Sequence, residues 1–171
     1  MQSWDTAAKA SELAHYSVCS TWGVAKEMIY LLDVWRKKVD YPELKRAALA
    51  LAQRFQPGKI LVEAKSSGIQ LIQELAQIRM EVTSCTPSGD KQKRLLLNTA
   101  PIETGRLRIP QQAPWLKDYI AELITFPRGQ YADQVDSTTQ ALEWIKNTPP
   151  EDPIFGFMRW QLEKHGIKVK R

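Results

Sequence analysis

A change of hydrophobic period in the first third of the chain is the feature that most limits the fold. Residues 41–55, YPELKRAALALAQRF, place apolar side chains at three- and four-residue steps, which predicts an amphipathic helix. Pro42 marks its first turn, and the QPG sequence that follows marks its end. The apolar strand KILVE (59–63) and a second helix (66–78) come next. This alternation predicts an α/β fold, in which helices pack on a sheet with parallel strands.

The segments on either side extend this sheet. Residues 17–24 and 27–36 are β-rich, and the short connection between them predicts an antiparallel hairpin. The second run is apolar on both faces through Leu32, which predicts a strand buried in the middle of the sheet. Further predictions are a strand within 79–85, a basic helix from Lys91, loop and a brief extended piece over 99–114, a helix over 115–126 and a last helix beginning near Asp133. The whole is expected to be a mixed sheet flanked by helices.

Length and composition exclude several classes of protein. The 171 residues suit one domain, predicted over 1–148, with a Pro-rich and then basic tail over 149–171. The 43% hydrophobic content argues against general disorder. No apolar run approaches membrane-spanning length, the N-terminal residues lack the apolar core of a signal peptide, and the two cysteines have no zinc-site spacing. We therefore expect a cytoplasmic protein without a membrane partner.

Four carboxylates stand where the predicted elements begin or end. Glu63 closes an apolar strand, and Asp5 follows a short stretch that has the composition of a first strand. Asp133 and Asp136 lie near a helix start, one turn apart on the same face. Because ligands of α/β sheets collect at the carboxyl ends of strands, these side chains are candidates for a single site.

Clustered carboxylates repel each other unless a cation compensates them. Mg²⁺ and Mn²⁺ do so through oxygen ligands, and a pair of such ions suits phosphodiester hydrolysis. The pattern also allows structural roles for the same residues. Asp5 could cap a turn, Asp133 and Asp136 are favourable at a helix start, and Glu63 could pair with Lys65. Spacing alone does not decide between these alternatives.

An ordered set of sequence words resembles a known family. The words are WDTAAK, YSVCSTWGV, YLLDVWRKKVDYPELKRA, ILVEAKSSGIQLIQEL, GDKQKR, ETGRLRIP, APWLKDYIAEL and FPRGQYADQVDSTTQAL, within residues 2–146. Together they resemble the C-terminal nuclease domain of tailed-phage terminase large subunits, the DNA-packaging motors. The resemblance implies an RNase H-like fold and cleavage of double-stranded DNA.

The resemblance also implies roles for individual residues. Asp5, Glu63 and Asp133 match the catalytic acids that hold two divalent ions, Mg²⁺ or Mn²⁺, and Asp136 is a further candidate ligand. In the basic word DKQKR, Lys91 and Arg94 are expected to contact DNA near the site. The implied partners are double-stranded DNA, the terminase ATPase domain, the small terminase subunit and the portal, in the cytoplasm of a bacterial host.

The sequence departs from the family pattern at two points. The last motif commonly carries two adjacent aspartates and then a third, but Ala132 occupies the first of these places. The chain also has no GxxxxGK[ST] phosphate loop, so we expect an isolated nuclease domain without the ATPase half, whether as a fragment, a split gene or a prophage remnant.

Three functional hypotheses follow from these observations. The leading one is a two-metal-ion endonuclease that cleaves concatemeric viral DNA during genome packaging. The alternatives are an RNase H-like junction resolvase, and a DNA-binding or motor-docking module whose metal site is weakened by Ala132. His15 is near Asp5 in the sequence, but a surface position is the simpler interpretation and it receives no catalytic role.

Overall fold

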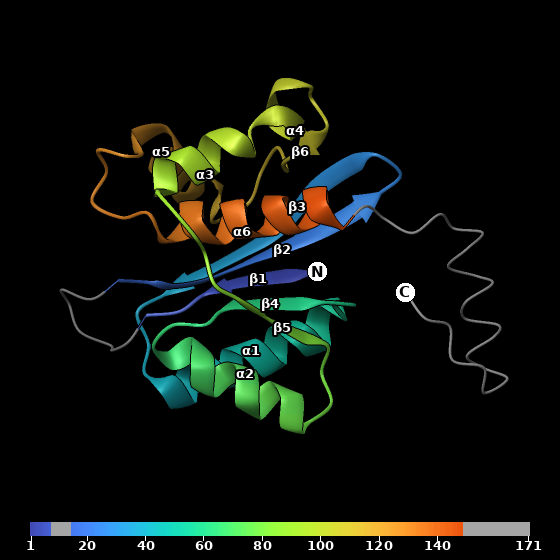
Figure 1. Ribbon diagram of the computed structural model, residues 1–171, viewed down its shortest axis with the longest axis vertical. Helices are drawn as coiled ribbons and strands as arrows, with labels where there is room; N and C mark the ends of the chain where they lie inside the picture. The colour runs from blue at the N-terminus through green and yellow to red at the C-terminus, as the bar shows by residue number, and fades with distance from the viewer. Residues whose placement is uncertain (8–14, 149–171) are drawn as a thin grey trace, which may run out of the picture.

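The structure is a computed structural model that describes residues 1–7 and 15–148. It contains a six-stranded sheet with helices on both faces (Figure 1). The strands are β1 (Gln2–Asp5), β2 (Ser17–Ala25), β3 (Met28–Lys37), β4 (Ile60–Glu63), β5 (Val82–Cys85) and β6 (Leu107–Arg108). The helices are α1 (Tyr41–Phe55), α2 (Ser67–Gln77), α3 (Lys91–Leu97), α4 (Ala100–Glu103), α5 (Leu116–Thr125) and α6 (Asp133–Asn147). The predicted α/β class with a mixed sheet is confirmed.

The order of the strands brings several strand ends to one edge of the sheet. Across the sheet the order is β5-β4-β1-β2-β3-β6. β1, β4 and β5 are parallel to one another, whereas β2 is antiparallel to both of its neighbours. The carboxyl ends of β1, β4 and β5 therefore share one edge, where β2 begins and β3 ends. The predicted hairpin is confirmed as β2 and β3.

One face of the sheet is covered by α1 and α2, shown in cyan to green in Figure 1. α1 begins where predicted, because the Asp40 side chain accepts a hydrogen bond from the Glu43 amide at 3.0 Å. Trp4 and Val62 on the strands and Leu71 on α2 are completely buried in this layer. Burying an apolar side chain of this size contributes about 1.5–3 kcal/mol, so this layer is a major source of stability.

The other face carries α6, which lies on β1 and β2 (Figure 1). Three serines join the helix to these strands. The Ser137 hydroxyl donates to the Ser3 carbonyl at 2.8 Å, and the Ser3 hydroxyl donates back to the Ser137 carbonyl at 2.7 Å. The hydroxyls of Ser20 and Ser137 are 2.6 Å apart. These directional contacts fix the position of α6 along β1.

Two details of the fold differ from the prediction. β3 is not buried on both faces: Tyr30 is 38% exposed and Leu32 is 52% exposed. Both residues point to the face that α1 and α2 cover, but the buried core of that face is built on β1, β2 and β4, so the prediction was wrong for this strand. A short helix, α4, also forms within 99–114, where only loop and an extended piece were expected; the extended piece is β6.

The predicted tail over 149–171 lies outside the described residues. The domain boundary proposed at residue 148 accordingly stays a prediction. In the part of the chain that the structure describes, no helix combines the length and apolar character needed to cross a membrane.

Candidate active site

Asp5 and Glu63 lie side by side on the face of the sheet that carries α6. In β1 and β4, Trp4 and Val62 are paired in register, so the next residue of each strand is also adjacent. Because side chains alternate along a strand, the two acids point away from the apolar layer in which Trp4 and Val62 are buried. The two carboxyl groups are close enough that Glu63 raises the pKa of Asp5, by its charge and by hydrogen bonding to the protonated form. The sequence-based placement of these two acids at strand ends is thus what the structure shows.

Gly68 allows α2 to start close to the end of β4. A Cβ atom built on Gly68 would lie 2.1 Å from the Glu63 carbonyl oxygen and 3.0 Å from the Thr6 hydroxyl. Only glycine therefore permits this approach without movement of the strand end. Steric contact with the end of β4 thus explains why a glycine stands at the start of α2.

Asp133 and Asp136 enter the same region from the first turn of α6. Asp133 is 4% exposed, and its Oδ2 accepts a hydrogen bond from the Tyr16 amide at 3.0 Å. Its Oδ1 lies 3.1 Å from Nδ1 of His15, whose side chain is largely exposed. Asp136 is 7% exposed and points toward α3. The predicted helix start and the shared face of the two aspartates are confirmed.

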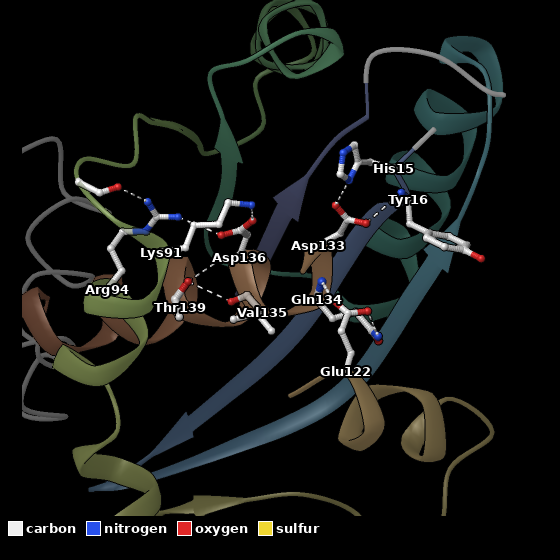
Figure 2. Close-up of polar contacts among 11 residues, drawn as sticks. His15, Tyr16, Lys91, Arg94, Glu122, Asp133, Gln134, Val135, Asp136 and Thr139 are labelled. Atoms are coloured by element: carbon white, nitrogen blue, oxygen red, sulfur yellow. Dashed lines mark hydrogen bonds and ion pairs between the residues drawn. The ribbon is translucent and has the colours of Figure 1, made fainter. Parts of the chain in front are cut away.

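Lys91 and Arg94 reach Asp136 from α3, as Figure 2 shows. α3 begins at Lys91 because the Asp90 side chain accepts from the Lys93 amide at 3.0 Å. Arg94 Nη2 donates to Asp136 Oδ1 at 2.9 Å, and Lys91 Nζ forms a short ion pair with Asp136 Oδ2. Partial burial opposes the charge of Lys91, but its hydrogen bond to Asp136 and the surrounding carboxylates raise its pKa. Both basic residues thus lie at the acidic cluster.

All four carboxylates and both basic residues line one cavity, of about 570 Å³. The pKa of Asp5 is raised well above its usual value, first by loss of solvent, then by the charge of Glu63 and the hydrogen bond to it, and by the charges of Asp136 and Asp133. Ionisation of Asp5 is therefore unfavourable in this cluster, and a cation bound there would make it more favourable.

The chemical type of these donors, carboxylate oxygens, is the one that hard divalent cations prefer. In the described residues, however, no three side chains of the His, Cys, Asp and Glu types converge closely enough to hold one ion. Lys91 and Arg94 occupy the carboxylate of Asp136, and Tyr16 and His15 engage that of Asp133. Binding an ion would require some of these contacts to be exchanged.

Several contacts beside the site were not predicted from the sequence, although His15 was considered there and given no catalytic role. His15 contacts Asp133 although the two are 118 positions apart, and Tyr16 supplies the backbone donor. Glu122 binds the start of α6 from α5. No clear signal for Glu122 was present in the sequence, because its burial beside Tyr119 on α5 is seen only in the structure.

Comparison with known proteins places the chain in a family. The terminase RNase H-like domain family matches residues 2–144. No curated protein matches the chain significantly. Among solved structures, the large terminase nuclease of thermophilic phage G20c with bound zinc has a TM-score of 0.63 and 18% sequence identity, over 84% of this chain and 78% of that one. The same nuclease has also been solved with bound magnesium and with bound cobalt.

Two further structures share the fold. The large terminase of another thermophilic bacteriophage has a TM-score of 0.62 and 12% identity, covering 84% of this chain but 39% of that longer one. The Fowlpox virus resolvase, solved with Holliday junction DNA, has a TM-score of 0.53 and 13% identity, over 87% of this chain and 98% of that one. The fold is thus RNase H-like, and the chain belongs to the terminase RNase H-like domain family.

Proposed function

We propose that the chain is a divalent-metal-dependent endonuclease domain that hydrolyses phosphodiester bonds of double-stranded DNA during viral genome packaging. The observation that carries the proposal is the convergence of Asp5, Glu63, Asp133 and Asp136 on one cavity next to two basic side chains. Family membership supports the same activity. The metal-bound structures of the G20c nuclease support the use of divalent ions.

The proposed ligands are Asp5, Glu63 and Asp133, with Asp136 as a further one, for two Mg²⁺ or Mn²⁺ ions. Ions held there would supply Lewis acidity toward the phosphate and lower the pKa of a bound water. The protein's own contribution is to hold the acids together: the register of β1 and β4 places Asp5 beside Glu63, and the amide of Tyr16 donates to Asp133. We propose that Lys91 and Arg94 bind DNA phosphate once Asp136 no longer engages them.

The test compares cleavage of supercoiled plasmid by the wild-type protein and by Glu63→Gln, with Mg²⁺, with Mn²⁺ or with chelator. We expect metal-dependent cutting that falls at least about 100-fold in the variant, since even residues that only support metal ligands cost about 10–100-fold. Glu43→Gln, an exposed acid on α1, is the matched control and should cut normally. Cutting in chelator, or full activity of Glu63→Gln, would refute the proposal.

Two other functions make different predictions in the same assay. A junction resolvase, which the likeness to the Fowlpox resolvase fold favours, would cut four-way junctions in preference to linear duplex. A weakened DNA-binding or motor-docking module would bind DNA in a salt-sensitive manner without cutting it. Ala132, which lies directly before Asp133 at the start of α6, is the residue to change in that case. Cleavage gained by Ala132→Asp would support the weakened site, and no gain would oppose it.

The proposed partners follow from the family and not from contacts of this chain. Within viral genome packaging, the ATPase domain of the large subunit, the small terminase subunit and the portal are the proteins with which such a domain is expected to act. We propose that this takes place in the cytoplasm of an infected bacterium.

A further inference from the structure

The helix that presents Asp133 and Asp136 begins without a side-chain cap of its own. Ala132 occupies the N-cap position of α6 and has no side-chain acceptor for the first-turn amides. Those amides need partners, because the first turn of a helix has no carbonyl oxygens to accept from them. The partner here comes from another helix. Glu122 of α5 accepts the Gln134 amide on Oε1 at 2.6 Å and the Gln134 side-chain amide on Oε2 at 2.7 Å.

A chain of contacts through Arg36 and Tyr16 also links Glu122 to Asp133. Its Oε2 lies 3.3 Å from Nη2 of Arg36 on β3. The Arg36 guanidinium stacks on the ring of Tyr16, 3.5 Å from the ring centroid. The amide of Tyr16 is the donor to Asp133 Oδ2 at 3.0 Å. One carboxylate is thus linked both to the helix turn that carries Asp133 and to the residue that donates to the Asp133 side chain. Figure 2 shows the first of these links, from Glu122 to Gln134.

Packing alone does not account for an acid at this position. Glu122 is 7% exposed, and a carboxylate is rarely buried to this extent unless it is paired. Replacing a buried ion pair with apolar groups is often neutral or stabilising, so burial of a charge is poor support for a purely stabilising role. Both oxygens of Glu122 are directed at groups that determine where Asp133 lies.

We infer that Glu122 is a positioning residue of the active site: it replaces the helix cap that Ala132 lacks and so fixes the place of Asp133 relative to Asp5 and Glu63. This inference rests on the proposed function for its catalytic meaning. Its structural content, that Glu122 holds the first turn of α6, can be tested without metal or DNA.

The first experiment is hydrogen exchange of residues 133–137 in chelator, in wild-type protein, Glu122→Ala and Leu51→Ala. Leu51 is buried on α1, on the opposite face of the sheet, and its truncation serves as a destabilising control away from the site. We expect exchange in this segment to rise at least about 10-fold in Glu122→Ala and to rise much less in Leu51→Ala. Unchanged exchange in Glu122→Ala, or an equal rise in both variants, would overturn the inference.

Should Glu122→Ala fail to fold, Glu122→Gln is the second variant. Glutamine keeps an acceptor for the Gln134 amide but removes the charge that faces Arg36, so a smaller rise in exchange is expected. If hydrogen exchange does not rise at all in Glu122→Gln, the contact between Glu122 and Arg36 does not help to hold the first turn of α6, and that part of the inference is overturned.

The second experiment is calorimetric titration with Mn²⁺, at a temperature where all variants are folded. We expect Glu122→Ala to bind Mn²⁺ about 10–100-fold more weakly and Leu51→Ala to bind as wild type does. Equal affinity in Glu122→Ala and wild type would overturn the positioning role. If wild type itself binds no Mn²⁺, the proposed function fails, and the exchange result still decides whether Glu122 holds the helix.

Discussion

The two sides of β1 are packed by different kinds of contact. On the side of α1 and α2, Trp4 is buried among apolar residues such as Leu44 and Leu71. On the side of α6, Ser3 exchanges two hydrogen bonds with Ser137. Apolar contact is non-directional, so it holds a helix against the sheet without defining its position finely. Hydrogen bonds depend on distance and angle, so they define the position of α6 along the strand.

The difference matches the location of the acids. Asp5 lies on the α6 side, and Asp133 lies one turn before Ser137. The serine contacts therefore determine how far the acids of α6 are from those of the strands. We conclude that the α6 side, besides its own apolar core around Trp22 and Leu142, holds the directional contacts that set the geometry of the site. Variants on the two sides should separate stability from the geometry of the site.

The largest loss of stability is expected from Leu71→Ala on the apolar side. Leu71 is completely buried, and truncation of such a residue costs about 2–5 kcal/mol of unfolding free energy. Urea denaturation would measure the loss. The space left by the truncated Leu71 side chain lies on the other face of the sheet from the acids. The Mn²⁺ affinity of the variant, measured at low temperature, should therefore equal that of wild type. A large drop in affinity would show that the two sides are not separable.

Gly68→Ala should affect both properties. The new methyl group would meet the Glu63 carbonyl, and relieving this overlap costs about 1–3 kcal/mol of stability. Because the end of β4 must shift, we expect cleavage activity to fall about 10-fold or more. Plasmid cleavage and urea denaturation would be measured together, with Gly58→Ala as the control, since a Cβ there meets no atom within 4 Å. Normal activity in Gly68→Ala would contradict the expected link to Glu63.

Ser137→Ala should lose less stability than Leu71→Ala but should disturb the placement of the site acids more. It removes the hydroxyl contacts to the Ser3 carbonyl and to Ser20, a loss of about 1–2 kcal/mol. The helix can then slide along β1, so Mn²⁺ affinity and cleavage should fall more than in Leu71→Ala. Thr125→Ala, which removes a hydroxyl bonded to its own helix, is the control. If Leu71→Ala lost more Mn²⁺ affinity than Ser137→Ala, the two sides of β1 would not differ in the way described.

Local patterns were enough to predict α1 and the strand end that carries Glu63. The Pro42 signal and the apolar spacing predicted α1, and the acid that ends an apolar strand predicted the place of Glu63. Parallel strands must end at one edge, so Asp5 and Glu63 could be placed together from the sequence alone. These features depend on residues close together in the sequence.

The contacts that fix the site depend on residues far apart in the sequence. The run Asp133–Thr139 is buried throughout although it is mostly polar, so hydropathy predicts exposure for it. Its partners, such as His15 and Glu122, could not be identified by periodicity. The same holds for the pairing of Lys91 with Asp136, which are 45 positions apart. Long-range side-chain pairing of this kind has no signature in the local pattern.

The smallest effect concerns pH and the acid pair itself. The folded state raises the pKa of Asp5 above about 3.8, its usual value, through loss of solvent and the charge of Glu63. The folded protein thus holds this proton more tightly than the unfolded chain does. The stabilisation from the protonated form is complete below the unfolded pKa and is lost as pH rises through the folded pKa. At neutral pH without metal, Asp5 therefore opposes folding.

Asp5→Asn should remove this opposition while abolishing cleavage. In chelator, its unfolding free energy should exceed that of wild type at neutral pH and should change less between acidic and neutral pH. Urea denaturation across that range would measure the slope, with Glu43→Gln expected to follow wild type. Added Mn²⁺ should stabilise wild type but not Asp5→Asn, because the variant would lack one of the proposed carboxylate ligands. An identical pH dependence of the unfolding free energy in the two proteins would mean that the charge of Asp5 is already compensated. In that case, the ionised Asp5 would not destabilise the folded protein.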